Sequence, residues 1–223
     1  MNYYKLVNRF EDTIVSQFMG HTHSELYYLT FLDPNDSTSR PTSVIHSAPS
    51  VTTYTEFNPA YRIYTIDGER TGTTYKIIDW EEWYLNLEKA NKQPPGMDAP
   101  WQQMYDSILA EYNIDYVEPE EMYQLAQRFL KGDPAVQKYV GNRNRQFNTY
   151  CDYHCQQDVV CSIFTSQRDN SGLCAGLDIK TTAKWSESKL EKIREHLQKA
   201  KSNFIRASLH QKERNEKDCP ISF

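Results

Sequence analysis

The feature that most constrains the fold is a change in hydrophobic period about 90 residues into the chain. Between Asp12 and Leu87, apolar and polar residues alternate in runs such as "DTIVSQFM", "ELYYLTFL", "PTSVIHSAPSVTTY", "AYRIYTIDG" and "TTYKIIDWEEWYLNL". These runs are rich in β-branched and aromatic residues, which is typical of strands. Turn-forming residues separate them at "DPNDSTSRP", "FNP" and "DGERTG". This part of the chain is therefore predicted to form β-sheet.

Beyond residue 100 the apolar residues recur at helical spacing. The stretches "APWQQMYDSILAEYN" and "EPEEMYQLAQRFLKG" repeat apolar residues at steps of three and four, which predicts helices over 99–113 and 118–132. Gly132 and Pro134 are expected to end the second helix. The segment Lys89–Pro100, "KANKQPPGMDAP", is predicted to be the linker between the two regimes.

Length and composition allow a buried core and exclude some functions. The chain has 223 residues, of which 39% are hydrophobic and 13% aromatic, enough for one large domain or two small ones. The net charge of -5 provides no basic field for binding nucleic acid. No run approaches the roughly 18 apolar residues of a transmembrane segment. The first residues also lack the apolar segment of a signal peptide.

Four of the five cysteines are clustered. Cys151, Cys155, Cys161 and Cys174 lie within "CDYHCQQDVVCSIFTSQRDNSGLC", and Cys219 is left over. Such a cluster is a disulfide framework or a metal knuckle. The spacing is irregular for zinc, so disulfides and an oxidising compartment are favoured. Asn35 begins the sequon "NDS", a single short motif that also indicates a glycosylated, secretory protein.

The stretch "GHTH" places His21 and His23 one residue apart, after a predicted strand and Gly20. In a loop that follows a strand, the two imidazoles can diverge toward two metal ions about 3.5–4 Å apart. The glycine would let the backbone approach the ions closely. The alternative is two histidines in a turn, because H-x-H is frequent by chance and a binuclear zinc site needs further ligands.

A last helix is predicted over residues 185–213. Its apolar residues recur on one face, and lysines and arginines outnumber acids on the rest. The helix either meets anionic lipid or packs on the domain as a solvated surface helix. The second interpretation is favoured because Glu187, Glu191 and Glu195 interrupt the basic face.

Several of these stretches resemble one family. "NYYKLVNRFEDTIVSQFMGHTHSELYYLTF", "SRPTSVIHSAPSVTTYTEFNPAYRIYTIDG", "WYLNLEKAN" and the cysteine cluster look like the C-terminal half of acid sphingomyelinases and acid-sphingomyelinase-like phosphodiesterases. These proteins are calcineurin-like metallophosphoesterases. The resemblance covers nearly all of residues 2–174 and implies an α+β fold, the C-terminal part of a metallophosphoesterase β-sandwich with flanking helices, followed by a disulfide-linked helical subdomain.

The resemblance also implies domain boundaries. Residues 1–90 would be the C-terminal portion of the catalytic domain, residues 91–178 the helical, cysteine-containing subdomain, and residues 179–223 an amphipathic basic helix and tail. It pairs Cys151 with Cys155 and Cys161 with Cys174.

Site residues follow from the same resemblance. In the family the first histidine of G-H-x-H binds one zinc and the second binds the other, so His21 and His23 would be metal ligands. Tyr54 is a candidate contact for the lipid head group, or equally a packed strand aromatic. For Arg62, a buried charge pair that holds the strand is favoured over catalysis.

The implied activity is zinc-dependent hydrolysis of sphingomyelin, or a related phosphodiester, to ceramide and phosphocholine at a membrane surface, by a secreted or lysosomal protein. The family's other metal motifs, D-x-H, G-D-x-x-D and G-N-H-E, do not occur among the nineteen residues before Gly20. We therefore expect a fragment that is inactive alone. The alternative is a noncatalytic, secreted binding module derived from the family.

Overall fold

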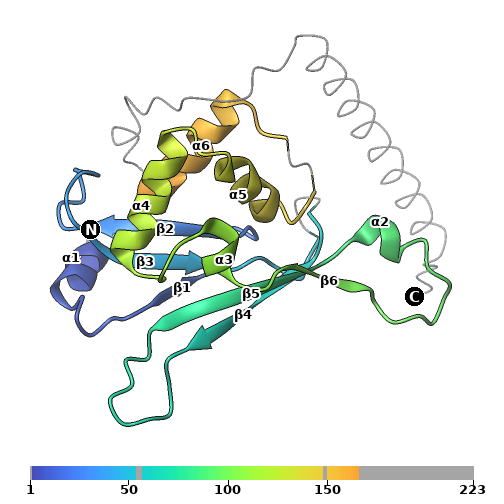
Figure 1. The fold of residues 1–223 in the computed structure, drawn as a ribbon, viewed down its shortest axis with the longest axis horizontal. Coiled ribbons are helices and arrows are strands. Elements are labelled where there is room, and N and C mark those ends of the chain that lie inside the picture. Colours follow the sequence, from blue (N-terminus) through green and yellow to red (C-terminus); the bar gives the residue numbers. More distant parts are fainter. Residues whose placement is uncertain (1, 54–56, 148–149, 166–223) are drawn as a thin grey trace, which may run out of the picture. The chain divides into compact units, whose positions relative to one another are not determined.

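The computed structural model describes residues 2–53, 57–147 and 150–165 (Figure 1). The chain divides into two units after residue 182, and all of the described residues belong to the first. Tyr54, Cys174, Cys219 and the helix expected over 185–213 lie outside the described residues.

The first sheet has three strands in the order β1-β3-β2. β1 (Gln17–Met19) runs parallel to β3 (Pro41–Ser47), and β2 (Leu26–Phe31) pairs with β3 antiparallel. Every residue of β3 is buried, as expected for a central strand covered on both faces. β3 therefore lies at the centre of this sheet and connects β1 to the core.

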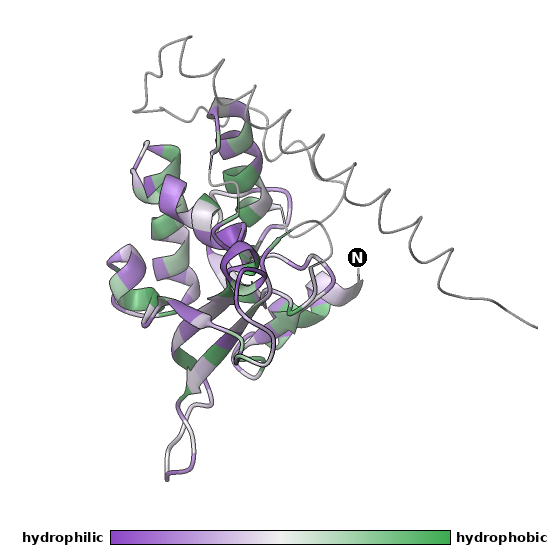
Figure 2. Ribbon diagram, turned by 90° about the vertical axis from the view of Figure 1, so that its right-hand side faces the viewer, coloured by the Kyte–Doolittle hydropathy of each residue, from purple (hydrophilic) through white to green (hydrophobic). Residues whose placement is uncertain are grey.

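The second sheet is an antiparallel meander in the order β4-β5-β6. β4 (Ala60–Ile66) and β5 (Ile77–Leu85) form a long hairpin, and β6 (Trp101–Tyr105) pairs with the other side of β5. The short helix α2 (Leu87–Ala90) follows β5, and its N-cap Asn86 accepts a hydrogen bond from the backbone N–H of Lys89. The tip of the β4–β5 hairpin is hydrophilic (Figure 2).

Four helices follow the second sheet and gather on one side of the first (Figure 1). They are α3 (Ile108–Tyr112), α4 (Pro119–Leu130), α5 (Ala135–Arg143) and α6 (Tyr153–Phe164). α4 and α6 pack on β2, and α4 also contacts β3. α1 (Asn2–Arg9) contacts β3 as well. The core lies between these helices and the sheets, with Leu29, Phe129 and Phe164 almost fully buried.

The sequence of α4 accounts for its position. Pro119 stands in the first turn, where its missing N–H costs nothing, and two glutamates follow it. The apolar residues at helical spacing are the buried ones, Met122, Leu125, Ala126 and Phe129. Gly132 takes a φ of 85°, a left-handed conformation that ends a helix at little cost in glycine. The predicted helix over 118–132 is confirmed.

The helix predicted over 99–113 is wrong in its first half. Residues Trp101–Tyr105 form β6, and only Ile108–Tyr112 are helical. Pairing with β5 satisfies the backbone groups of this segment, which overrides a helical spacing of only two apolar residues. Ser107 then starts α3 as its N-cap, because its side chain accepts a hydrogen bond from Ala110 N. The strand expected from Asp12 is also shorter, since β1 begins at Gln17.

The observed class is α+β, as the resemblance implied, and the structure contains the expected Cys151–Cys155 disulfide. Cys161 is disulfide-bonded too, and its expected partner Cys174 lies outside the described residues. The metallophosphoesterase sandwich and the boundaries at residues 90 and 178 stay predictions. Within the described ranges, no helix is long and apolar enough to cross a membrane.

Two leucines that lie close in the sequence test the position of the core. Leu29 on β2 is completely buried, whereas Leu32 just after β2 is 57% exposed. Leu29→Ala should lower the free energy of unfolding by about 2–5 kcal/mol because it leaves a cavity in the core. Leu32→Ala should change it by less than about 0.5 kcal/mol. Urea unfolding measures both, and equal effects would contradict the described core.

Candidate functional site

The G-H-T-H loop follows β1 directly, where the pairing of β1 with β3 ends at Met19 and Ser47. The Oγ1 atom of Thr22 lies 2.8 Å from Oγ of Ser47, a hydrogen bond that fastens the loop to the end of β3. His21 is exposed and His23 half-buried. The first sheet therefore presents both imidazoles on a loop held at one end of its central strand.

Both histidines have left-handed backbones, with φ values of 76° at His21 and 58° at His23. Few non-glycine residues take positive φ, although histidine does so more often than most. Such conformations cost of order 1–3 kcal/mol each and are concentrated at functional sites. The backbone of the loop therefore agrees with the predicted metal site, but it does not distinguish that site from a turn, since five other described non-glycine residues also take positive φ.

The described residues do not complete a zinc site. A zinc ion is held by three or four protein ligands. Across residues 2–53, 57–147 and 150–165, no group of three or more histidine, cysteine, aspartate or glutamate side chains could hold a metal ion. His21 and His23 can thus supply two imidazoles, and a zinc ion would need further ligands from elsewhere.

A buried charge cluster joins the two sheets and includes a residue that follows the G-H-T-H loop closely in sequence. Arg62 of β4 contacts Glu82 of β5 at 2.9 Å and Glu25, which directly precedes β2, at 3.3 Å. All three side chains are at most 3% exposed. The hydroxyl group of Tyr105 donates toward Glu25 (2.7 Å) and toward Glu82 (3.1 Å). The backbone two residues after His23 is therefore anchored to the second sheet.

The charges of this cluster are unequal, with two carboxyl groups facing one guanidinium. Burial raises the pKa of Glu25 well above its ordinary value, and the charge of Glu82 raises it further. Burial also raises the pKa of Glu82, against the opposing effect of Arg62. Protonation of one carboxyl group balances the charge, and Glu25 is the group that favours the proton.

Aromatic rings surround the guanidinium. Its central carbon lies 4.6 Å from the ring centre of Trp80 and 5.5 Å from that of Tyr64, distances typical of cation–π contacts. Trp80 Nε1 donates to the hydroxyl oxygen of Tyr105 (2.8 Å). His46 of β3 packs edge-on against Trp80, with ring centres 5.4 Å apart. Burial, and secondarily the charge of Arg62, lowers the pKa of His46 to about 3.

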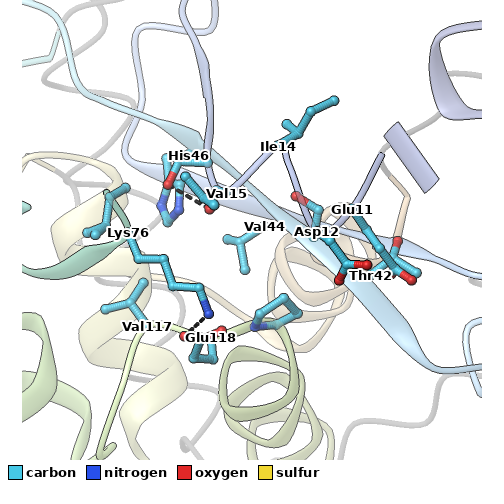
Figure 3. Close-up of a pocket in the computed structure, with 14 residues that line it drawn as sticks. Glu11, Asp12, Ile14, Val15, Thr42, Val44, His46, Lys76, Val117 and Glu118 are labelled. Atoms are coloured by element: carbon cyan, nitrogen blue, oxygen red, sulfur yellow. Dashed lines mark hydrogen bonds and ion pairs between the residues drawn. The ribbon is translucent and has the colours of Figure 1, made fainter. Parts of the chain in front are cut away.

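A separate cavity of about 200 Å³ lies between the segment before β1, β3 and the start of α4 (Figure 3). Lys76 and Glu118 form an ion pair of 2.8 Å in its wall. His46, Asp12 and Val44 also line it, whereas His21 and His23 do not. The cavity is therefore distinct from the G-H-T-H loop and does not unite the predicted metal ligands.

Comparison with known proteins decides the family. Residues 37–177 match the acid sphingomyelin phosphodiesterase C-terminal region. The chain belongs to this family. It is 31% identical over 173 residues to sphingomyelin phosphodiesterase 1 of Caenorhabditis elegans, a match covering 78% of the chain and 29% of that protein. It is 33% identical over 179 residues to sphingomyelin phosphodiesterase of Homo sapiens, covering 79% of the chain and 27% of that protein.

A less similar relative of the chain is not named a sphingomyelin phosphodiesterase. The chain is 28% identical over 170 residues to a cyclic GMP-AMP phosphodiesterase of Homo sapiens, covering 71% of the chain and 34% of that protein. The chain thus spans about a third or less of the length of these relatives. The resemblance to acid sphingomyelinases is confirmed, and the activity of a whole protein is a matter for proposal.

The sequence-predicted site residues of the family are only partly brought together. His21 and His23 share one loop, and Arg62 forms the buried ion pairs expected of it. Asn35 is exposed in the turn between β2 and β3, where a glycan would find room, and its glycosylation stays a prediction. The sequence analysis did not identify the two partners of Arg62. For Glu82 a signal exists, because a glutamate between the tryptophans of "DWEEW" indicates a carboxyl group inside a strand.

Removing the guanidinium tests the role of the charge cluster. Arg62→Met should lower the free energy of unfolding by about 3–5 kcal/mol, because two buried carboxyl groups lose their cation. Arg70→Met is the matched control, since Arg70 pairs with Asp67 at a site where the arginine is 63% exposed, and it should cost less than about 1 kcal/mol. Equal destabilisation in urea titrations would refute a stabilising role of the cluster.

The stability of the protein should depend on pH through His46. Its pKa is about 3 in the folded chain and about 6.5 when unfolded. The folded state binds fewer protons in this window, so the stabilisation is complete above pH ~6.5 and is lost as the pH falls toward 3. The slope contributed by His46 should approach ~1.4 kcal/mol per pH unit. Subtracting the unfolding curves of His46→Gln from those of the wild type isolates this contribution, and parallel curves would exclude it.

Proposed function

We propose that this chain forms the C-terminal part of a zinc-dependent phosphodiesterase that hydrolyses sphingomyelin to ceramide and phosphocholine. The observation that carries the proposal is the G-H-T-H loop, with two histidines of left-handed backbone anchored by Thr22 at the end of β3. The family of the chain and the names of its relatives supply the substrate.

His21 and His23 would each supply an imidazole to a zinc pair. When bound, zinc lowers the pKa of a coordinated water and polarises a phosphoryl oxygen. The remaining ligands would belong to the part of the longer relatives that this chain does not span. The chain's own contribution is to hold the two histidines in place, through Thr22 and through Glu25 in the charge cluster.

Open sheet edges support a larger β-sandwich. Among the described strands, β1 pairs only with β3, and β4 pairs only with β5. Phe18 and Met19 of β1 are 54% and 43% exposed, and Ile66 of β4 is 48% exposed. Exposed apolar residues beside unpaired strand edges are features that further strands would cover. The catalytic sandwich of the family would be completed on this side.

The proposed location is outside the cell or in the lysosome, where sphingomyelin is met at a membrane surface. The Cys151–Cys155 disulfide supports an oxidising compartment. An exposed sequon asparagine, Asn35, is compatible with the same route.

Two proteins test the function. The 223-residue chain alone should release no phosphocholine from sphingomyelin above background and should retain zinc weakly. A protein in which the other metal motifs of the family precede this chain should bind zinc and hydrolyse sphingomyelin. In that protein, His21→Ala and His23→Ala should each lower hydrolysis at least about 100-fold and reduce the zinc content.

His154→Ala is the matched control, because His154 is an exposed histidine of α6 outside the loop, and it should change neither measurement. Loop variants that keep full zinc content and full activity would refute the metal-ligand assignment. A longer protein that binds no zinc and hydrolyses no sphingomyelin would favour the noncatalytic binding module.

A further inference from the structure

Three aromatic side chains meet on the face of the second sheet that points away from the charge cluster. Tyr61 of β4 is registered opposite Trp83 of β5, and Trp83 opposite Gln103 of β6. Trp101 lies two residues before Gln103 on the same strand. Cross-strand partners share a face, so these side chains lie opposite to Arg62 and Glu82, which neighbour them in sequence and are buried. We call Tyr61, Trp83 and Trp101 the aromatic platform.

The rings of the platform are in contact and partly exposed. Tyr61 and Trp83 are nearly parallel, with ring centres 6.4 Å apart and planes inclined by 3°. Trp101 meets Tyr61 edge to face, with ring centres 4.9 Å apart. All three residues are half-buried, and the indole Nε1 of Trp83 is buried. The part of Trp83 that reaches solvent is therefore carbon, without a hydrogen-bond donor.

Two polar side chains beside the platform are hydrogen-bonded to each other. Gln103 Nε2 donates to Oε2 of Glu81 at 2.9 Å. Glu81 lies two residues before Trp83 on β5, and its cross-strand partner is the exposed residue Ile63. Of the residues named on this face, Glu81 is the charged one. The platform thus combines aromatic rings with one carboxylate, and the side-chain amide of Gln103 is already bonded to that carboxylate.

We propose that the aromatic platform with Glu81 binds the quaternary ammonium head group of a phosphocholine lipid in a membrane surface. A trimethylammonium group has no N–H to donate, so it is attracted by ring faces and by a nearby negative charge. Those are the two features that this face provides. The inference rests on the proposed function, because it gives the phosphodiesterase a second contact with the membrane that contains its substrate.

The charge of this face disfavours the other occupants. A carboxylate repels the phosphates of nucleic acid and of anionic lipid. A sugar stacks on aromatic rings but also needs hydrogen bonds from polar side chains, and Gln103 and Glu81 are already paired. A choline head group needs no hydrogen bonds from polar side chains. In addition, partly exposed tryptophan and tyrosine are typical of membrane–water interfaces.

The test is sedimentation of the full 223-residue chain with vesicles of phosphatidylcholine and sphingomyelin, compared with vesicles of phosphatidylglycerol. The chain should bind the first and not the second. Trp101→Leu and Glu81→Gln should each weaken binding about two- to fivefold, the effect of losing one exposed cation–π or charge contact. Tetramethylammonium chloride should compete at millimolar concentration, and ammonium chloride should not.

Tyr116→Leu is the control, since Tyr116 is 58% exposed and lies outside the platform, and it should bind like the wild type. Glu81→Gln keeps the volume of the side chain, so a loss of binding in this variant with unchanged melting temperature is not a folding defect. Equal binding of wild type, Trp101→Leu and Glu81→Gln would overturn the proposal. So would equal binding to both vesicles, or competition by free galactose in place of tetramethylammonium.

The double variant His21→Ala, His23→Ala separates this inference from the proposed activity. It should bind phosphatidylcholine vesicles as the wild type does, because the G-H-T-H loop is not part of the platform. Loss of hydrolysis with vesicle binding retained would leave the platform standing. Loss of vesicle binding in the double variant would place the lipid contact at the loop and refute the platform.

Discussion

The arrangement of the two sheets depends on the ion pairs formed by the guanidinium group of Arg62. It contacts Glu82 within its own sheet and Glu25 just before β2, in an interior where each side chain is nearly inaccessible to water. Its contacts extend through Tyr105 and Trp80 to His46 of the central strand β3. Because an unpaired charge is very costly at this depth, the two sheets are held in one relative position, and the G-H-T-H loop is placed with them.

The site and the cluster divide two tasks between neighbouring residues. His21 and His23 stand on a loop in which both take positive φ, His21 being exposed and His23 half-buried. Glu25, two residues later, is buried and committed to Arg62 and Tyr105. A loop attached to a rigid anchor keeps its geometry without being packed itself. Exposure therefore falls steeply along this short segment, from the exposed His21 through the half-buried His23 to the buried Glu25.

The parts of this structure that were predictable from sequence are those controlled by local pattern. β4, β5 and α4 occur where the sequence patterns predict them, and Arg62 in a strand implied a buried partner. In β4 and β5, however, the side chains of Arg62 and Glu82 are buried while Ile63 and Ile66 are exposed, the reverse of what apolar–polar alternation predicts. β6 was not predictable, because pairing with β5 decided between strand and helix for a segment that carries both signals. The sequence also did not reveal that the partners of Arg62 are Glu25 and Glu82. They lie 37 and 20 positions from Arg62 and meet it only through the fold. The pairing of Cys151 with Cys155 came from family resemblance, as spacing alone leaves several connectivities open.

The helices that cover the first sheet come from the far end of the described chain, and this order affects how the protein is made. Tyr27 of β2 donates to the carbonyl oxygen of Met122, 95 positions later, and its backbone N–H contacts the hydroxyl of Tyr139, 112 positions later. Contacts of such long range slow folding. At ~5–20 residues per second, the ribosome exposes β2 and β3 for several seconds before α4 and α6 emerge. During that interval the apolar residues of β2 and β3 lack the helices that cover them and can contact other nascent chains.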